Sequence, residues 1–297
     1  EKIASIGDDI YWKIIRINGD NSIRLVYSGT VPPTKETSIY DVTNYRNIGD
    51  DSYNINSDNK AYLGYMYTLD NDHGYTTDSY IKTIIDSWYK NYFKDNSNYL
   101  ADNGFCNNRT INNNVSESNT YYNITDRMPS YSFYTSNVAS LMCQNKNDLF
   151  TTKDTNKGNG ALTYPVGILN ADEILLAGSK FYENSISFSP VITVGPTMPM
   201  MRNNGNFLKN YLYNYSTESK SLETILTMTP EYYSTNNDNG YILINVNGNL
   251  TGVSISIGGS IKPVINLSSS LYATGSGTWD DPYIPTFDNP NPDKVEE

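Results

Sequence analysis

The sequence predicts an α+β domain in which two helices lie among short antiparallel strands and long loops. Three observations lead to this fold class: apolar residues at helical spacing between 81 and 93, a capping motif before a second apolar segment near 171, and alternating runs elsewhere. The chain has 297 residues, of which 38% are hydrophobic, so it can build a sizeable core. We expect a single domain over residues 1–287, followed by a flexible tail rich in Pro and acidic residues at 288–297.

The first predicted element is a β-hairpin within residues 10–27. Apolar and polar residues alternate on both sides of the turn sequence Asn18-Gly19-Asp20-Asn21. Two such runs around an Asn-Gly turn are typical of a hairpin. Residues 28–76 are dominated by Ser, Thr, Asn, Asp, Gly and Tyr, so we expect loops there, with short strands at most.

A long amphipathic helix is predicted behind a Thr77-Asp78 capping signal. Its apolar positions follow a helical repeat and should form one buried face: Ile81, Ile84, Ile85, Trp88, Tyr89, Tyr92 and Phe93. Residues 94–135 are polar again, and we expect a loop there. A short helical turn is predicted at 138–142.

A short buried strand at 164–169 is predicted to precede a second helix at 171–177. Asn170 stands at the N-cap position and Glu173 at N3, which resembles a capping box, and Gly178 is placed to end the helix. The remaining chain has the pattern of strands. They are expected at 227–230, 241–246, 252–257 and 261–267, with turns at Asn247-Gly248 and Gly258-Gly259.

The composition excludes several functional classes. The formal net charge is −11, and no basic stripe is visible, so binding of a nucleic acid through its phosphates is not expected. The chain has 40 Asn and 27 Tyr but one His and two Cys, which argues against most metal-hydrolase and thiol chemistry. It contains no GxSxG, HExxH, Walker or GxGxxG string, so we do not expect an enzyme.

The two cysteines, Cys106 and Cys143, are predicted to form one disulfide. Neither lies in a CxxC spacing, and no His stands near them, so a zinc or redox site is disfavoured. Two buried free thiols are the alternative. A disulfide favours an extracellular address. No apolar run reaches the roughly 18 residues of a membrane span, so any leader or anchor should lie in a segment absent from this chain.

Six strings in order resemble a group of uncharacterised bacterial surface domains. They are YWKIIRINGDNSIRLVY, the helix end SWY, FCNNRT with the later Cys143, YPVGILNADEILLAG, YLY followed by TMTP, and IKPVINLSSSLYATGSGTWDDPY. Together they span residues 11–283. That group is similar to the C-type-lectin-like fold in its formylglycine-generating-enzyme variant. The resemblance therefore implies a C-type-lectin-like domain, often displayed behind a membrane or prepilin-like segment.

The resemblance implies a secreted or anchored ectodomain on the bacterial cell surface. The enzymatic relatives of this fold use thiols near the C-terminal end, and this chain has no Cys after Cys143. We therefore expect a non-catalytic, adhesin-type binding domain of a surface or pilus-associated protein. Its partner would be a host or neighbouring-cell protein or glycan. The alternatives are a glycan-binding or glycan-active module, and a structural spacer or subunit of a surface fibre.

The candidate binding residues are tyrosines and methionines, because Tyr and Asn on loops resemble the composition of antibody paratopes. The alternative is that many of these side chains fill the core or reflect an AT-rich genome. The segment 196–226 is the preferred binding loop. The candidates are Tyr211, Tyr213, Tyr215, Tyr232, Tyr233, Met198, Met200 and Met201.

No cofactor is expected, and a calcium ion in an acidic loop is the alternative. The strings around Asp70 and Asp72, and Asp280 and Asp281 after Trp279, partly resemble calcium ligands, although no Glu closes the first loop. His73 lies among acids in the same loop, and we expect it to be solvated rather than catalytic.

Overall fold

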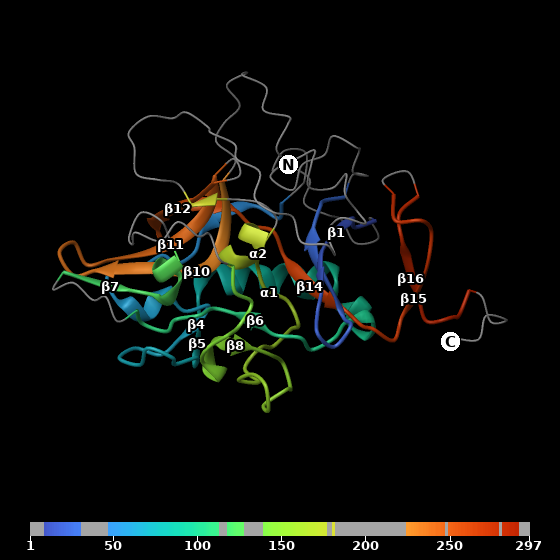
Figure 1. Ribbon diagram of the computed structural model, residues 1–297, viewed down its shortest axis with the longest axis horizontal. Helices are drawn as coiled ribbons and strands as arrows, with labels where there is room; N and C mark the ends of the chain where they lie inside the picture. The colour runs from blue at the N-terminus through green and yellow to red at the C-terminus, as the bar shows by residue number, and fades with distance from the viewer. Residues whose placement is uncertain are drawn as a thin grey trace, which may run out of the picture.

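The protein is a mixed α+β structure built mostly from sheets, with two α-helices in the described part of the chain (Figure 1). The computed structural model describes residues 9–30, 47–112, 118–127, 139–176, 180–181, 224–246, 249–278 and 281–290. One core of buried apolar side chains extends through these segments. None of the helices in these segments is long and apolar enough to cross a membrane.

A seven-stranded sheet is the largest sheet in the described part of the chain. Its strands run in the order β3-β13-β10-β11-β12-β9, and β7 pairs with β10 beside this path. The strands are β3 (Asp50–Ser52), β7 (Asn119–Tyr121), β9 (Lys180–Phe181), β10 (Thr224–Ser234), β11 (Asn239–Val246), β12 (Asn249–Ser254) and β13 (Gly258–Ser260). The pairs β10–β13 and β12–β9 are parallel, and the other pairs are antiparallel.

A three-stranded sheet, in the order β1-β2-β14, contains the predicted N-terminal hairpin. Its strands are β1 (Trp12–Ile17), β2 (Ile23–Tyr27) and β14 (Val264–Leu267). The turn is closed by a bond from the Asn18 N–H to the Ser22 carbonyl of 2.8 Å, and Asn21 has a positive φ of 64°. The predicted hairpin is therefore confirmed, and a strand from near the C-terminus completes its sheet.

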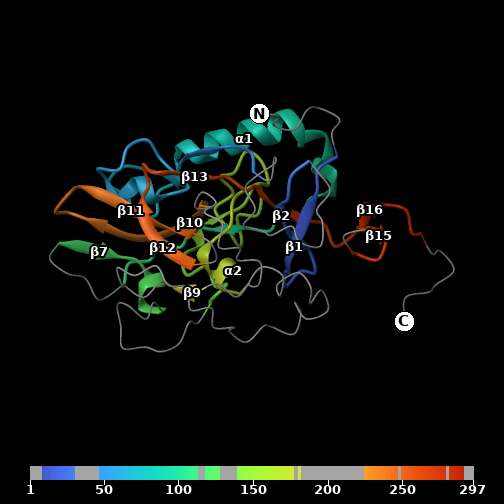
Figure 2. The same ribbon diagram turned by 90° about the horizontal axis from the view of Figure 1, so that it is seen from above.

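The first predicted helix is confirmed as α1 (Tyr80–Tyr92). The prediction that Thr77-Asp78 caps this helix was wrong, because Ser79 is the N-cap and its side chain accepts a hydrogen bond from the Lys82 N–H. Residues 77–78 instead form β5. Figure 2 shows α1 on one side of the large sheet and the second helix on the other. The end of α1 packs Trp88 edge-on against Trp12 and Tyr27 of the hairpin.

The second predicted helix is confirmed as α2 (Ala171–Leu176). Its capping box is formed in both directions. The Glu173 N–H donates to Asn170 Oδ1 at 2.9 Å, and the Asn170 N–H donates to Glu173 Oε2 at 3.1 Å. The helix packs against β10 and β11.

Short elements complete the fold. They are the pairs β4 (Met66–Tyr67) with β5 (Thr77–Asp78), β6 (Phe105–Cys106) with β8 (Leu149–Phe150), and β15 (Tyr272–Thr274) with β16 (Ile284–Thr286), and the 3-10 helices η1 (Lys60–Leu63), η2 (Lys94–Tyr99), η3 (Asn123–Arg127) and η4 (Lys146–Asp148). The expected loop at 94–135 thus contains η2, β6, β7 and η3 within its described residues. In Figure 1, β15 and β16 project at the end of the molecule opposite β7.

Three local predictions were wrong. The segment 164–169 is not a strand, because only Gly167 makes a bridge, to Val264. Residues 139–142 have no helical turn, and Val138 lies outside the described residues. Gly258-Gly259 belongs to β13, which pairs with β3, and the turn before it is at 255–257.

The predicted disulfide between Cys106 and Cys143 is present. The two Cα atoms are 5.7 Å apart, and the bridge ties β6 to the segment before η4. Asn247-Gly248 lies outside the described residues, but Val246 pairs with Asn249, so β11 and β12 are adjacent antiparallel strands.

Candidate binding surface

A row of three tyrosines crosses three neighbouring strands at one end of the large sheet. The ring of Tyr232 on β10 stacks on that of Tyr241 on β11, with centroids 4.3 Å apart and planes at 12°. On its other side, the Tyr232 ring is tilted against Tyr121 of β7 at 5.6 Å. All three side chains are half-buried. We call these residues the tyrosine row.

Amide side chains hold the outer hydroxyls of the tyrosine row. Asn119 Nδ2 donates to the hydroxyl of Tyr121 at 3.0 Å, and Asn237 Nδ2 donates to the hydroxyl of Tyr241 at 3.0 Å. Ordered aromatic rings with amide neighbours lose little side-chain entropy when a ligand binds. The sheet therefore presents a preformed aromatic and amide surface at this end.

A cleft of about 320 Å³ lies near the same end of the sheet. Its lining residues are mostly of polar types, and they come from the start of η1, the 70–72 turn, β7 and the end of β10. The lining residues are Asp58, Asn59, Lys60, Ala61, Asp70, Asn71, Asp72, Thr120, Tyr233 and Thr235. Its volume lies at the lower end of the range of small-molecule sites.

Hydrogen bonds and an ion pair fix the walls of this cleft. Lys60 Nζ lies 2.6 Å from Asp72 Oδ1 and joins η1 to the 70–72 turn. The Tyr233 hydroxyl donates to the Asp58 carbonyl at 3.0 Å, which joins β10 to the segment before η1. The cleft therefore offers carboxylates, amides, hydroxyls and one ammonium group in fixed positions.

A buried carboxyl group, that of Glu231, is adjacent in the sequence to the tyrosine row. Glu231 precedes Tyr232 on β10 and is 4% exposed, and its Oε2 has no hydrogen-bond partner in the part of the chain that the structure describes. Burial raises the pKa of Glu231 to about 8. Burial therefore favours the neutral carboxylic acid form of this side chain over the carboxylate.

The backbone explains how Glu231 reaches its position. The pairing of β10 with β11 shifts register between Pro230 and Tyr232, which makes Glu231 the extra residue of a β-bulge. Its carboxyl lies over Gly252 of β12, where an added Cβ would stand 1.5 Å from Oε2. Only glycine leaves room for this side chain.

A buried charge cluster near the cleft was not anticipated. Asp148 is fully buried, and its carboxylate accepts from the Arg109 N–H and Nε, each at 2.8 Å. His73 Nδ1 lies 3.0 Å from Asp148 Oδ2, so the expectation that His73 is merely solvated was wrong. These residues lie far apart in the sequence, and no spacing signal relates them. Arg109 also donates to the Gly74 carbonyl at 3.0 Å, so the cluster fixes the loop that carries His73.

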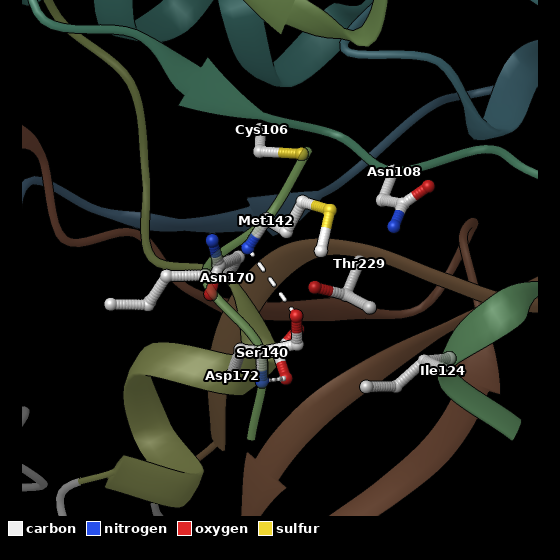
Figure 3. Close-up of a pocket in the computed structure, with 9 residues that line it drawn as sticks. Cys106, Asn108, Ile124, Ser140, Met142, Asn170, Asp172 and Thr229 are labelled. Carbon is white, nitrogen blue, oxygen red and sulfur yellow. Dashed lines mark hydrogen bonds between the residues drawn. The ribbon is translucent and has the colours of Figure 1, made fainter. Parts of the chain in front are cut away.

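A second hollow, shown in Figure 3, has room for about one water molecule and for no larger ligand. Its volume is about 10 Å³, and it lies where the disulfide, α2 and β10 meet. In Figure 3, the Ser140 N–H donates to Asp172 of α2, at 2.8 Å. Thr229 of β10 accepts from the Ala171 N–H, also at 2.8 Å. We interpret this hollow as a packing junction.

The structure places two of the predicted binding residues. Tyr232 belongs to the tyrosine row, and Tyr233 lines the cleft from the same strand. The other six candidates lie outside the described residues: Tyr211, Tyr213, Tyr215, Met198, Met200 and Met201. The sequence did not single out Tyr241, whose place in the row depends on the pairing of β10 with β11.

The weak calcium candidates are not gathered into one site. Asp70 and Asp72 line the cleft, and Asp281 accepts from the Ser276 N–H at 2.8 Å in the loop between β15 and β16. Asp280 lies outside the described residues. Among the residues that the structure describes, no group of three or more His, Cys, Asp and Glu side chains could hold a metal ion.

No protein-family profile matches the chain, and neither a curated protein nor a solved structure shows significant similarity to it. The geometry of the described residues is therefore the basis for a functional proposal.

Proposed function

We propose that the chain is a non-catalytic extracellular binding domain of a bacterial surface or pilus-associated protein, of the adhesin type. The C-type-lectin-like fold is part of this proposal. The observation that carries it is the tyrosine row with its two amide-bound hydroxyls. The disulfide supports the extracellular address, because such bonds persist in oxidising compartments.

The tyrosine row suits a protein partner. Tyr supplies a large, rigid contact surface with a polar tip, and it is enriched among the residues that dominate binding energy. Two of the three phenol rings stack face to face, so the row offers ring edges and hydroxyls rather than open ring faces. Such a surface matches the mixed polar and apolar character of protein interfaces.

A glycan is the second candidate ligand, and the cleft favours it. Carboxylates, amides and threonine hydroxyls line a space of about 320 Å³. Every lining residue except Ala61 carries a polar group, and these groups could hydrogen-bond a polyhydroxylated ligand. The cleft and the tyrosine row use neighbouring residues of β10, so one region of the protein carries both candidate sites.

A binding screen with matched variants tests these proposals. The purified chain is applied to an array of defined glycans and to a panel of purified extracellular proteins, with and without a chelator. We expect Tyr232→Ala to weaken a protein ligand by about tenfold or more, because a central aromatic anchor is lost. Asp72→Asn should instead weaken a glycan held in the cleft.

Tyr272→Ala is the control, because Tyr272 is an exposed tyrosine of β15, a strand that lies at the opposite end of the molecule from β7 in Figure 1. Its binding should equal that of the unchanged protein. Silence of the correctly folded protein in both screens would sink the binding proposal. Concentration-dependent self-association would favour the fibre or spacer alternative, and loss of binding with chelator would identify a calcium requirement.

A further inference from the structure

We infer that Glu231 is the trigger of a conformational switch in the proposed binding surface. In this switch, loss of the Glu231 proton turns the β10 bulge and separates Tyr232 from at least one of its two ring neighbours, Tyr241 and Tyr121. The inference rests on the proposed function, because it concerns regulation of the same tyrosine row.

The first argument is the position of the carboxyl group. Glu231 is buried, its Oε2 lacks a hydrogen-bond partner, and it occupies the space above Gly252, two strands away from β10. A protonated carboxyl tolerates such a site, whereas a carboxylate needs water or a counter-charge. An ionised Glu231 must therefore leave the space above Gly252.

The second argument is the backbone that would move. Glu231 is the extra residue of a bulge, and Pro230 beside it has no N–H to give to the strand ladder. The Tyr122 N–H donates to the Glu231 carbonyl at 3.0 Å, so β7 is tied to the same residue. A bulge is a local irregularity that can turn without dissolving the regular pairs on either side.

The third argument is the direct link to the tyrosine row. Tyr232 follows Glu231 and makes both ring contacts of the row. Rotation of the peptide unit between these two residues moves the Tyr232 ring away from at least one neighbour. The two arrangements of the bulge therefore correspond to an ordered and a separated tyrosine row.

The other ionisable groups described near the bulge are not proposed as the group whose loss of a proton moves it. Helix α2, which packs on β10 and β11, contributes Asp172 and Glu173. Asp172 accepts from the Ser140 N–H, and Glu173 is paired with Arg24. The phenols on the neighbouring elements are Tyr121, Tyr122 and Tyr241, and β10 itself adds Tyr232 and Tyr233. Burial alone accounts for the raised pKa of Glu231.

An optical titration tests the switch without any ligand. The near-ultraviolet circular dichroism of the tyrosines is followed from about pH 6 to about pH 9, where a Tyr with the ordinary pKa near 10 is still about nine-tenths protonated. The unchanged protein should show one transition with a midpoint near 8, and Glu231→Gln should show none. His73→Gln is the control, because it removes the only His of the chain. This variant should keep the transition if Glu231 is the group that titrates.

Carbon-13 NMR of the Glu231 carboxyl supplies an independent readout in the unchanged protein. The carboxyl resonance and the ring resonances of Tyr232 should titrate with the same midpoint. A carboxyl that titrates near the ordinary Glu value, or a transition that persists in Glu231→Gln, would overturn the switch. An absent ligand in the binding screen would leave the optical transition intact, so the two proposals fail separately.

Discussion

Two buried glutamates near the contact of α2 with the large sheet differ in their partners. Glu173 at the start of α2 is paired with Arg24 of β2, and Arg16 Nη2 of β1 lies 3.4 Å from its Oε1. Glu231 on β10 has no such counter-charge among the described residues, and its Oε2 has no hydrogen-bond partner there. Both side chains are shielded from water. Two carboxyl groups that are equally buried in this fold can therefore have very different partners.

The difference assigns distinct roles to the two regions. The ion pair of Glu173 links the N-terminal hairpin to α2. Burial lowers the pKa of Arg24, while Glu173 acts in the opposite direction and holds the guanidinium in its charged form. Arg24 also lies 4.6 Å from the centre of the Phe105 ring. Glu231 makes no link of this kind, so its region can respond to pH.

The largest expected effect is the pH dependence of stability due to Glu231. Its pKa is raised from 4.5 to about 8 in the folded protein, so the folded state keeps a proton that the unfolded state releases between these values. This contribution is fully present below about pH 4.5 and is lost as the pH rises through 8. The loss amounts to roughly 5 kcal/mol by linkage.

Urea unfolding at several pH values measures this contribution. Glu231→Gln should flatten the profile between about pH 5 and pH 9 and make the protein more stable than the unchanged chain at the alkaline end. An unchanged profile in this variant would mean that another group carries the pH dependence.

The next effect is the loss of the paired charge. Glu173→Gln leaves the Arg24 guanidinium buried without its counter-charge, and we expect the free energy of unfolding to fall by about 3–5 kcal/mol. The substitution tests the charge separately from the helix cap, because Gln at N3 can still serve in a capping box. Urea unfolding near pH 6 gives the value.

Glu231→Gln is the matched control for Glu173→Gln. Near pH 6 the folded state keeps the Glu231 proton and the unfolded state has released it, so the same substitution there should raise the free energy of unfolding by up to about 2 kcal/mol, opposite in sign to the change at Glu173. Equal losses at the two positions would contradict the distinction between paired and unpaired carboxyl groups. A double variant, Glu173→Gln with Arg24→Met, should recover part of the loss, since the fully buried unpaired charge is then removed and the remaining partner, Arg16, is partly exposed.

The sequence allowed prediction of the elements that local signals define. The Asn-Gly turn predicted the hairpin, the helical repeat from Ile81 predicted α1, and Asn170 with Glu173 predicted the start of α2. The Cys106–Cys143 disulfide followed from the absence of other metal ligands. Each of these signals lies within a few residues or concerns a unique pair.

The errors arose where tertiary contacts override local pattern. The apolar run at 164–169 reads as a strand, yet it pairs only through Gly167, and its side chains fill the core in an irregular conformation. Gly258 and Gly259 read as a turn, but both belong to β13, and a Cβ added at Gly259 would lie only 3.1 Å from the side chains of Leu226 and Thr224.

The candidate surface was partly accessible from the sequence. The abundance of Tyr and Asn indicated an aromatic and amide surface, and Tyr232 was among the candidates. The burial of Glu231 was not predicted, because it depends on strand β12 folding back beside β11. Two sequence signals could have indicated it: Pro230 inside a strand marks a bulge, and Gly252 inside a strand marks a close approach.

The smallest expected effect concerns the hydrogen bond that positions Glu173. Asn170→Ala removes the acceptor of the Glu173 N–H and should lower the free energy of unfolding by about 1 kcal/mol. Asn145→Ala is the control, because Asn145 caps the short helix η4 in the same way at an exposed site. Its loss should be smaller, since water can replace the cap. Hydrogen exchange at the Glu173 amide should accelerate in Asn170→Ala alone. Equal, negligible effects of both substitutions would show that the ion pair with Arg24 positions Glu173 without help from the cap, which would sharpen the contrast with Glu231.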